Sequence, residues 1–232
     1  MTRPSDLRRR RREQLRDAGV YLVTEEALSG ARTSDEVARA ALAAGVRVVQ
    51  VREKEGTARR ALEIALALRN VTRQVGALLL VNDRLDIAIA AEADGVHLGQ
   101  DDLPVATARA ILGPDVIIGL SITDPAQLDA PGVHEADYLG VGAVFATTSK
   151  VDARHTGLEL LAAARAAVDL PIIAIGGITL GNAAAAVREG ADVLAVIGAI
   201  AAAPDPGSAA QRMLEVVRIA RARPHDSAGS SG

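Results

Sequence analysis

Short apolar runs alternate with longer segments of helical periodicity along most of the chain. The apolar runs have the length and β-branched content of buried strands, and the segments between them repeat apolar residues every three to four positions. Strands that alternate with helices in this way pair in a parallel sheet. The predicted strands are 20–24, 47–53, 77–82, 95–99, 117–122, 138–145, 171–176 and 193–200, and the predicted helices are 58–69, 85–92, 105–112, 158–167 and 182–189.

The joins from helix to strand also repeat in sequence. "DAGVYLV", "AAGVRVVQ", "EADGVHL", "EADYLGV" and "GADVLAV" each place a small residue before a turn at Gly or Asp and then enter an apolar run. This pattern is typical of successive βα units. Eight units favour an α/β fold, a single (β/α)8 TIM barrel. An open doubly wound sheet is the structural alternative.

Composition indicates one large globular domain. The chain has 232 residues, of which 49% are hydrophobic and 24% charged, enough for one sizeable core. It has no cysteine and a net charge of -3, so disulfides and thiolate chemistry are excluded and nucleic acid is not an expected partner. The most apolar late stretch, 183–203, is interrupted by Arg188, Glu189 and Asp192. We expect a cytoplasmic protein that does not enter a membrane.

The two ends fall outside the βα pattern. We predict a basic helical arm over 1–17, a barrel domain over 18–222 and a disordered tail over 223–232. Five consecutive arginines at 8–12 suggest either a nucleic-acid arm or a solvated helical face, and the absence of nearby aromatic residues favours the solvated face. Removal of residues 1–12 should then leave activity intact.

Basic residues are predicted at the carboxyl-terminal end of the second strand. In "VVQVREKEG" the period of two puts Gln50, Arg52 and Lys54 on one face. Active sites of TIM barrels lie at the carboxyl-terminal ends of the strands, and an arginine beside a lysine suits a ligand with several phosphate oxygens. Lys54 and Lys150 are the only lysines among 26 cationic residues, which draws attention to both positions.

Acids and amides follow the next two strands. "VNDR" places Asn82 and Asp83 after the third strand, and "GQDD" places Asp101 and Asp102 after the fourth. These groups, with the neighbouring cations, suggest either a structural ring of ion pairs or a magnesium pyrophosphate site. Mg²⁺ binds through one or two carboxylates plus substrate phosphate, so the magnesium site explains both signs of charge.

Later strands add hydroxyl groups and glycines. Ser121 ends the fifth strand, and the loop "TTSK" after the sixth holds the second lysine. This loop is interpreted as a lid over a ligand, with an ordinary polar loop as the alternative. "AIGGIT" and "AVIGAI" end the last two strands in glycines whose amides form a phosphate cradle. His97 lies within the fourth strand and is interpreted as a packing residue.

Six motifs in this order resemble thiamine-phosphate synthases. They are "VQVREK", "VNDR", "GVHLGQDDLP", "TTSKVDA", "AIGGIT" and "GADVLAVIGAI", and the resemblance covers most of residues 21–202. It implies a TIM barrel that, with Mg²⁺, joins hydroxymethylpyrimidine pyrophosphate to a thiazole phosphate and releases pyrophosphate. The implied partners are these two small-molecule substrates, and a homo-oligomer is left open.

The resemblance also implies roles for residues at matching positions. Asp83 and Asp102 would bind magnesium, and Asp101 is the weaker candidate because the family varies there. Arg52, Lys54, Ser121 and Lys150 would be catalytic. The pyrimidine pyrophosphate would contact Gln50, Arg52, Lys54, Asn82, Ser121 and Lys150, and the thiazole phosphate would contact Thr147, Ser149, Gly177, Ile197 and Gly198.

Two positions depart from the family, and two other functions remain open. Ser149 stands where threonine is common, and Gly198 stands where serine is common, which removes a side-chain donor to the thiazole phosphate. A thiazole tautomerase on the same barrel would need a base in its pocket and no pyrophosphate site. A non-catalytic sensor of phosphorylated ligands would bind without turnover.

Overall fold

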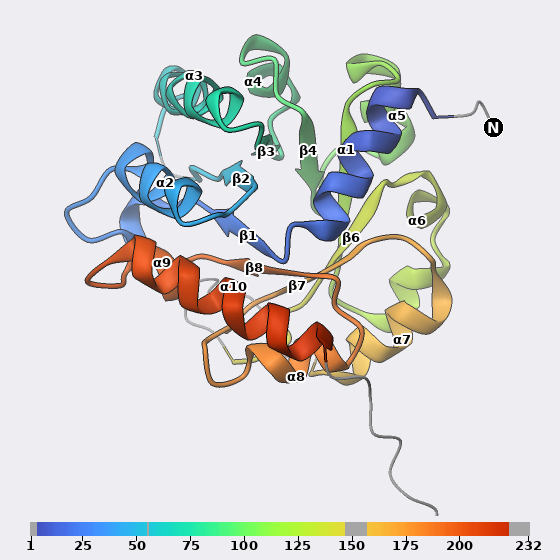
Figure 1. The fold of residues 1–232 in the computed structure, drawn as a ribbon. Coiled ribbons are helices and arrows are strands. Elements are labelled where there is room, and N and C mark those ends of the chain that lie inside the picture. Colours follow the sequence, from blue (N-terminus) through green and yellow to red (C-terminus); the bar gives the residue numbers. More distant parts are fainter. Residues whose placement is uncertain (1–3, 55, 147–156, 223–232) are drawn as a thin grey trace, which may run out of the picture.

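Eight parallel strands form a closed barrel in the computed structural model, which describes residues 4–54, 56–146 and 157–222 (Figure 1). Each strand pairs with its neighbours in the sequence, and β1 pairs with β8 to close the barrel. The prediction of a TIM barrel is therefore confirmed, and the open sheet is excluded. The strands are β1 (Val20–Val23), β2 (Val48–Val51), β3 (Leu78–Asn82), β4 (Gly95–Leu98), β5 (Ile117–Ile122), β6 (Tyr138–Val141), β7 (Ile172–Ile175) and β8 (Val193–Val196).

Helices surround the barrel, and more of them occur than the periodicity predicted. The five helices named from the sequence are present, as is the expected basic helix α1, whereas α2, α6, α9 and α10 were not named. None of the described helices is both long and apolar enough to cross a membrane. The helices are α1 (Asp6–Asp17), α2 (Ser34–Ala43), α3 (Ala58–Gln74), α4 (Leu85–Ala90), α5 (Val105–Leu112), α6 (Pro131–Glu135), α7 (Glu159–Ala167), α8 (Ala183–Arg188), α9 (Gly198–Ala201) and α10 (Pro206–Ala222), with short 3-10 turns η1 (Glu26–Leu28) and η2 (Pro125–Asp129).

Three strands end at least two residues earlier than predicted. β2 ends at Val51, so Arg52 and Lys54 lie beyond it, and β6 ends at Val141. The eighth apolar run was predicted as one strand, but α9 begins within it at Gly198. An apolar run is compatible with a strand or a buried helix, and here it contains both.

Side chains alternate between the inside of the barrel and its helical coat. On β3, Leu78 and Leu80 belong to the interior cluster, whereas Leu79 and Val81 pack in the larger cluster between strands and helices. The alternation follows from the period of two in a strand. A strand buried on both faces is apolar at nearly every position, so polar groups that face inward stand out.

Two glycines make room for rings inside the barrel. A Cβ added to Gly119 would lie 2.1 Å from the Tyr138 ring, and one added to Gly140 would lie 2.6 Å from His97 Cε1. Real Cβ atoms do not approach other atoms this closely. The two rings therefore occupy the space that side chains at residues 119 and 140 would fill.

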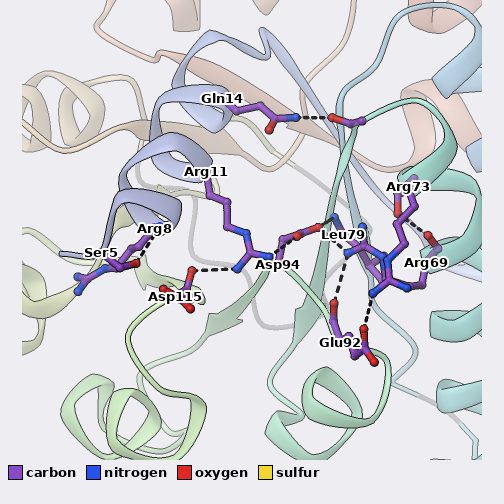
Figure 2. A network of polar contacts seen from close by, with 12 residues as sticks. Ser5, Arg8, Arg11, Gln14, Arg69, Arg73, Leu79, Glu92, Asp94 and Asp115 are labelled. Carbon is purple, nitrogen blue, oxygen red and sulfur yellow. Dashed lines mark hydrogen bonds and ion pairs between the residues drawn. The ribbon is translucent and has the colours of Figure 1, made fainter.

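Helix α1 closes the amino-terminal end of the barrel (Figure 1). Its Leu15 is fully buried in the interior cluster, and Arg8 Nε lies 2.6 Å from Asp137 Oδ1. Arg11 Nη2 lies 2.7 Å from Asp94 Oδ1, in the network that Figure 2 shows. The interpretation of residues 8–12 as a solvated face is therefore wrong for Arg8 and Arg11, because each reaches a carboxylate that precedes a strand.

These carboxylates belong to a repeated structural unit. Each aspartate directly precedes an even-numbered strand, accepts a hydrogen bond from a backbone amide of the strand before, and pairs with an arginine of the helix before that strand. Such a carboxylate is well satisfied, as buried charges must be. The sets are Asp94 with Leu79 N and Arg69, Asp137 with Ile118 N and Arg109, and Asp192 with Ile172 N and Arg165.

Deletion of residues 1–12 should destabilise the protein without slowing the folded enzyme. The deletion removes Arg8 and Arg11 from the buried carboxylates of Asp137 and Asp94, so we expect the thermal midpoint to fall by at least several degrees. The predicted site lies at the opposite end of the barrel, so turnover per folded molecule should persist. Thermal denaturation and an assay well below the midpoint test this, and lost turnover in folded protein would place α1 in the site.

Candidate active site

The first part of the site lies at the carboxyl-terminal end of β2. Gln50 is buried, and its strand neighbours Val23 and Leu80 both belong to the interior cluster, so Gln50 faces inward. Arg52 lies just beyond the strand with only 7% of its side chain exposed, and it forms an ion pair with Glu25. Glu25, which follows β1, was not predicted as a site residue, because no local pattern in the sequence marks it.

A cation and a carboxylate meet at the end of β3. Lys54 is exposed, and it and Arg52 both act electrostatically on Asp83. Burial, together with the neighbouring carboxylate of Asp102, raises the pKa of Asp83 to about 6, while Lys54 and Arg52 act to lower it. The structure therefore brings together four of the predicted residues, two cations and two carboxylates.

The loop after β4 holds Asp102 against the barrel. Its Oδ2 accepts a hydrogen bond from Gly99 N at 2.6 Å, so a turn of only three residues fixes the carboxylate. Asp101 is exposed, whereas Asp102 is partly buried. This difference agrees with the sequence-based preference for Asp102 over Asp101.

The Asp83 and Asp102 pair fits a magnesium ion. The described residues contain no group of three or more His, Cys, Asp or Glu arranged for a metal, so a site formed wholly by such side chains is absent there. Mg²⁺ instead commonly uses one or two carboxylates, keeps several waters and completes its shell with substrate phosphate. Two neighbouring carboxylates, of which Asp102 acts to raise the pKa of Asp83, are what a divalent cation would neutralise.

Asp83→Asn should stabilise the metal-free protein at neutral pH. Because the pKa of Asp83 is raised to about 6 in the folded protein, ionisation of this carboxyl destabilises the fold. The protein therefore loses stability as the pH rises from about 4 through 6. Asparagine removes that cost and tolerates the backbone φ of 60°. We expect a higher thermal midpoint than wild type at pH 8 in chelator and no such gain at pH 4. An equal difference at both values would contradict the carboxylate repulsion.

Ser121 and His97 meet inside the barrel mouth. His97 Nε2 lies 2.9 Å from Ser121 Oγ, and His97 Nδ1 lies 3.1 Å from the Tyr138 hydroxyl. Gln100 Nε2 donates to Ser121 O at 2.6 Å. The interpretation of His97 as a packing residue is incomplete, because its ring faces inward and contacts a predicted site residue. Asn82, its partner across the β3 and β4 pairing, shares that region.

The last two strands end side by side in the predicted phosphate cradle. Ile175 pairs with Ala195, and Gly177 and Ile197 each follow two residues later. Gly177 has a φ of 65°, and a Cβ there would lie 2.4 Å from Ala146 O, so only glycine fits. A Cβ added at Gly198 would meet nothing within 4 Å, which leaves open space at the start of α9.

The remaining predicted residues lie outside the described part of the chain. These are the loop residues expected to contact both phosphorylated groups, and the tail predicted at 223–232 is likewise outside. The loop residues are Thr147, Ser149 and Lys150.

A closed parallel barrel with polar groups gathered at the carboxyl-terminal ends of its strands is that of a TIM-barrel enzyme. Comparison with known proteins then places the chain in the thiamine-phosphate synthase family. The family described as thiamine monophosphate synthase matches residues 20–200, which confirms the resemblance drawn from the motifs.

Individual relatives agree with the family match. The chain is 49% identical to the thiamine-phosphate synthase of Moorella thermoacetica, over 88% of this chain and 98% of the relative. It is also 49% identical to the enzyme of Haloarcula marismortui, over 88% and 99%. The solved thiamine phosphate pyrophosphorylase of Pyrococcus furiosus is 38% identical with a TM-score of 0.82, covering 89% of this chain and 98% of that one.

Proposed function

We propose that this protein condenses hydroxymethylpyrimidine pyrophosphate with a thiazole phosphate, giving thiamine phosphate and pyrophosphate in a Mg²⁺-dependent reaction. Family membership supports the reaction. The observation that carries the site assignment is the placement of Asp83 and Asp102 beside Arg52 and Lys54 at one end of the barrel. Two signs of charge in one place suit a metal-bound polyphosphate.

The pyrophosphate would lie between the basic residues and the carboxylate pair. Arg52 offers a planar fork for phosphate oxygens, and Lys54 offers a mobile point charge. Asp83 and Asp102 would hold Mg²⁺, which when bound neutralises charge on the leaving pyrophosphate. On binding, Arg52 would exchange its carboxylate partner Glu25 for phosphate oxygens.

The reaction needs no side-chain nucleophile. The bond between the pyrimidine methylene carbon and the pyrophosphate oxygen breaks, and its electron pair leaves with pyrophosphate. The thiazole nitrogen then forms the new carbon–nitrogen bond to the delocalised pyrimidine cation. The protein's residues would stabilise the leaving charge, orient the two substrates and exclude water.

The thiazole phosphate would bind at the ends of β7 and β8. Backbone amides near Gly177, Ile197 and Gly198 would donate to its phosphate oxygens, and the space beside Gly198 is open, with Thr147 and Ser149 as the predicted hydroxyl donors. Gly198 in place of serine leaves this cradle to the backbone. The cradle would set the distance between the thiazole nitrogen and the pyrimidine cation.

Product analysis separates the synthase from its two rivals. Purified protein with Mg²⁺ and both substrates should form thiamine phosphate and pyrophosphate in equal amounts, and neither when either substrate is omitted. Asp83→Asn protein serves as the matched control. Conversion of the thiazole alone would favour a tautomerase, and binding without product would favour a sensor.

Lys150→Ala should slow the chemical step strongly. A lysine that meets the leaving pyrophosphate stabilises charge that develops in the transition state, so we expect kcat to fall by about 100-fold. Lys150→Arg keeps the charge and should retain more activity. Single-turnover rates of the three proteins test this, and unchanged turnover in Lys150→Ala would make the segment an ordinary polar loop.

A further inference from the structure

His97 joins two other polar groups inside the barrel. Its ring lies between Ser121 Oγ, 2.9 Å from Nε2, and the Tyr138 hydroxyl, 3.1 Å from Nδ1. The two rings are 5.5 Å apart between centroids. Tyr138 is fully buried in the interior cluster, and Ser121 lies near the mouth. The three groups therefore form a line from the core toward the proposed pyrophosphate site.

The chemistry of the ligand fixes the direction of these hydrogen bonds. Pyrophosphate oxygens accept and do not donate, so a serine that binds them must direct its single proton to them. Ser121 Oγ can then only accept from His97, which requires the proton on Nε2. A neutral imidazole carries one proton, so Nδ1 accepts from Tyr138. Burial raises the pKa of Tyr138, which keeps its hydroxyl a donor.

We propose that His97 is a positioning residue that turns the Ser121 hydroxyl proton toward the substrate pyrophosphate, with Tyr138 holding the required tautomer. This inference rests on the proposed function. His97 would not touch the reacting atoms. It would act on the rate only through Ser121, which makes the two residues a single energetic unit.

The surroundings hold this line of groups in place. Gly140 leaves the space that the His97 ring occupies, and Gly119 does so for Tyr138. Gln100 holds the Ser121 carbonyl. With both rings packed and the serine backbone anchored, rotation of the Ser121 hydroxyl is the freedom left for His97 to set.

A double-mutant cycle tests the proposal. Asparagine at position 97 is too short to reach Ser121, so His97→Asn and Ser121→Ala should each lower kcat/KM for the pyrimidine pyrophosphate about tenfold, through loss of a hydrogen bond to a charged group. KM for the thiazole phosphate should stay unchanged. In the Ser121→Ala background, His97→Asn should cost less than about twofold more. If the losses in kcat/KM of the two single variants multiply in the double variant, the proposal is wrong.

Two further variants distinguish the loss of these hydrogen bonds from a folding defect. His97→Gln places an amide N–H near the position of Nε2 and should recover part of the loss, whereas no recovery would contradict a donor role. Tyr138→Phe deletes one hydroxyl and keeps the ring, so its effect should also disappear in the Ser121→Ala background. A persistent effect there would overturn the tautomer argument.

The controls separate this inference from the proposed function. His134→Asn makes the same change on the exposed face of α6 and should leave all constants unchanged. If wild-type protein forms no thiamine phosphate, the proposed function fails. If wild type is active and the losses at His97 and Ser121 multiply, the proposed function stands and only the positioning role fails.

Discussion

Replacement of Asp102 by asparagine is expected to lower kcat by about 100-fold, whereas the same change at Asp101 should alter it less than about twofold. Asparagine keeps the size of Asp102, and its Oδ1 can still accept from Gly99 N. The loop should therefore keep its shape while the metal loses an anionic ligand. Asp101 is exposed. It is not the acceptor of the Gly99 hydrogen bond, and it is not the proposed metal ligand.

Steady-state rates as a function of free Mg²⁺ test this prediction. Asp102→Asn should require a higher Mg²⁺ concentration for half-maximal rate, and Asp101→Asn should not. Circular dichroism and thermal midpoints confirm that both variants are folded. Equal losses at the two positions, or an unchanged Mg²⁺ requirement in Asp102→Asn, would contradict the assignment of the metal ligand.

Asp137→Ala should lower the free energy of unfolding by about 3–5 kcal/mol. The Asp137 side chain is 1% exposed, and its oxygens lie 2.6 Å from Arg8 Nε and 2.6 Å from Arg109 Nη2. It also accepts from Ile118 N. Alanine would leave two guanidinium groups and a buried amide without their acceptor, and none of them can gain full hydration in return.

An exposed ion pair provides the matched control. Asp169 is fully exposed and lies 3.8 Å from Arg16, so Asp169→Ala should change the unfolding free energy by less than about 1 kcal/mol. Chemical denaturation of both variants, fitted with a common slope, gives the comparison. A small effect for Asp137→Ala would mean that this carboxylate does not stabilise the packing of α1 on the amino-terminal end of the barrel.

The barrel was predictable because its signals are local. Short apolar runs, helix-period segments and repeated joins all occur within single βα units, and one domain-sized chain can close eight of them in few ways. The unpredicted α2 also carries a local signal, since Thr33 and Glu36 form a capping box. The unpredicted α9 does not, because its four residues continue the apolar run of β8.

Part of the candidate site was predictable for the same reason. Residues at or just after the carboxyl-terminal end of a strand in a TIM barrel lie at its mouth, so the sequence alone predicts Arg52, Asp83 and Ser121 in one region. Ion pairs between residues that only the folded barrel brings together were not predictable. Glu25, which follows β1, pairs with Arg52 beyond β2, and Arg8 reaches Asp137 across 129 positions.

The orientation of the His97 side chain could not be predicted from the sequence. Its strand is only four residues long, and "GVHL" contains no alternation that distinguishes inside from outside. The glycine that admits its ring, Gly140, lies on β6, so its purpose depends on neighbours in space. Sequence identified the strand, while the register of three strands identified the contact with Ser121.

We expect this chain to make thiamine phosphate at a site where carboxylates hold Mg²⁺ against pyrophosphate. The most direct test is product formation from both substrates with Mg²⁺, with chelator, and with Mg²⁺ restored. We expect thiamine phosphate and pyrophosphate in equal amounts, loss of both in chelator and recovery on restoration. Equal product in chelator would contradict the magnesium site, and no product from folded protein would contradict the synthase itself.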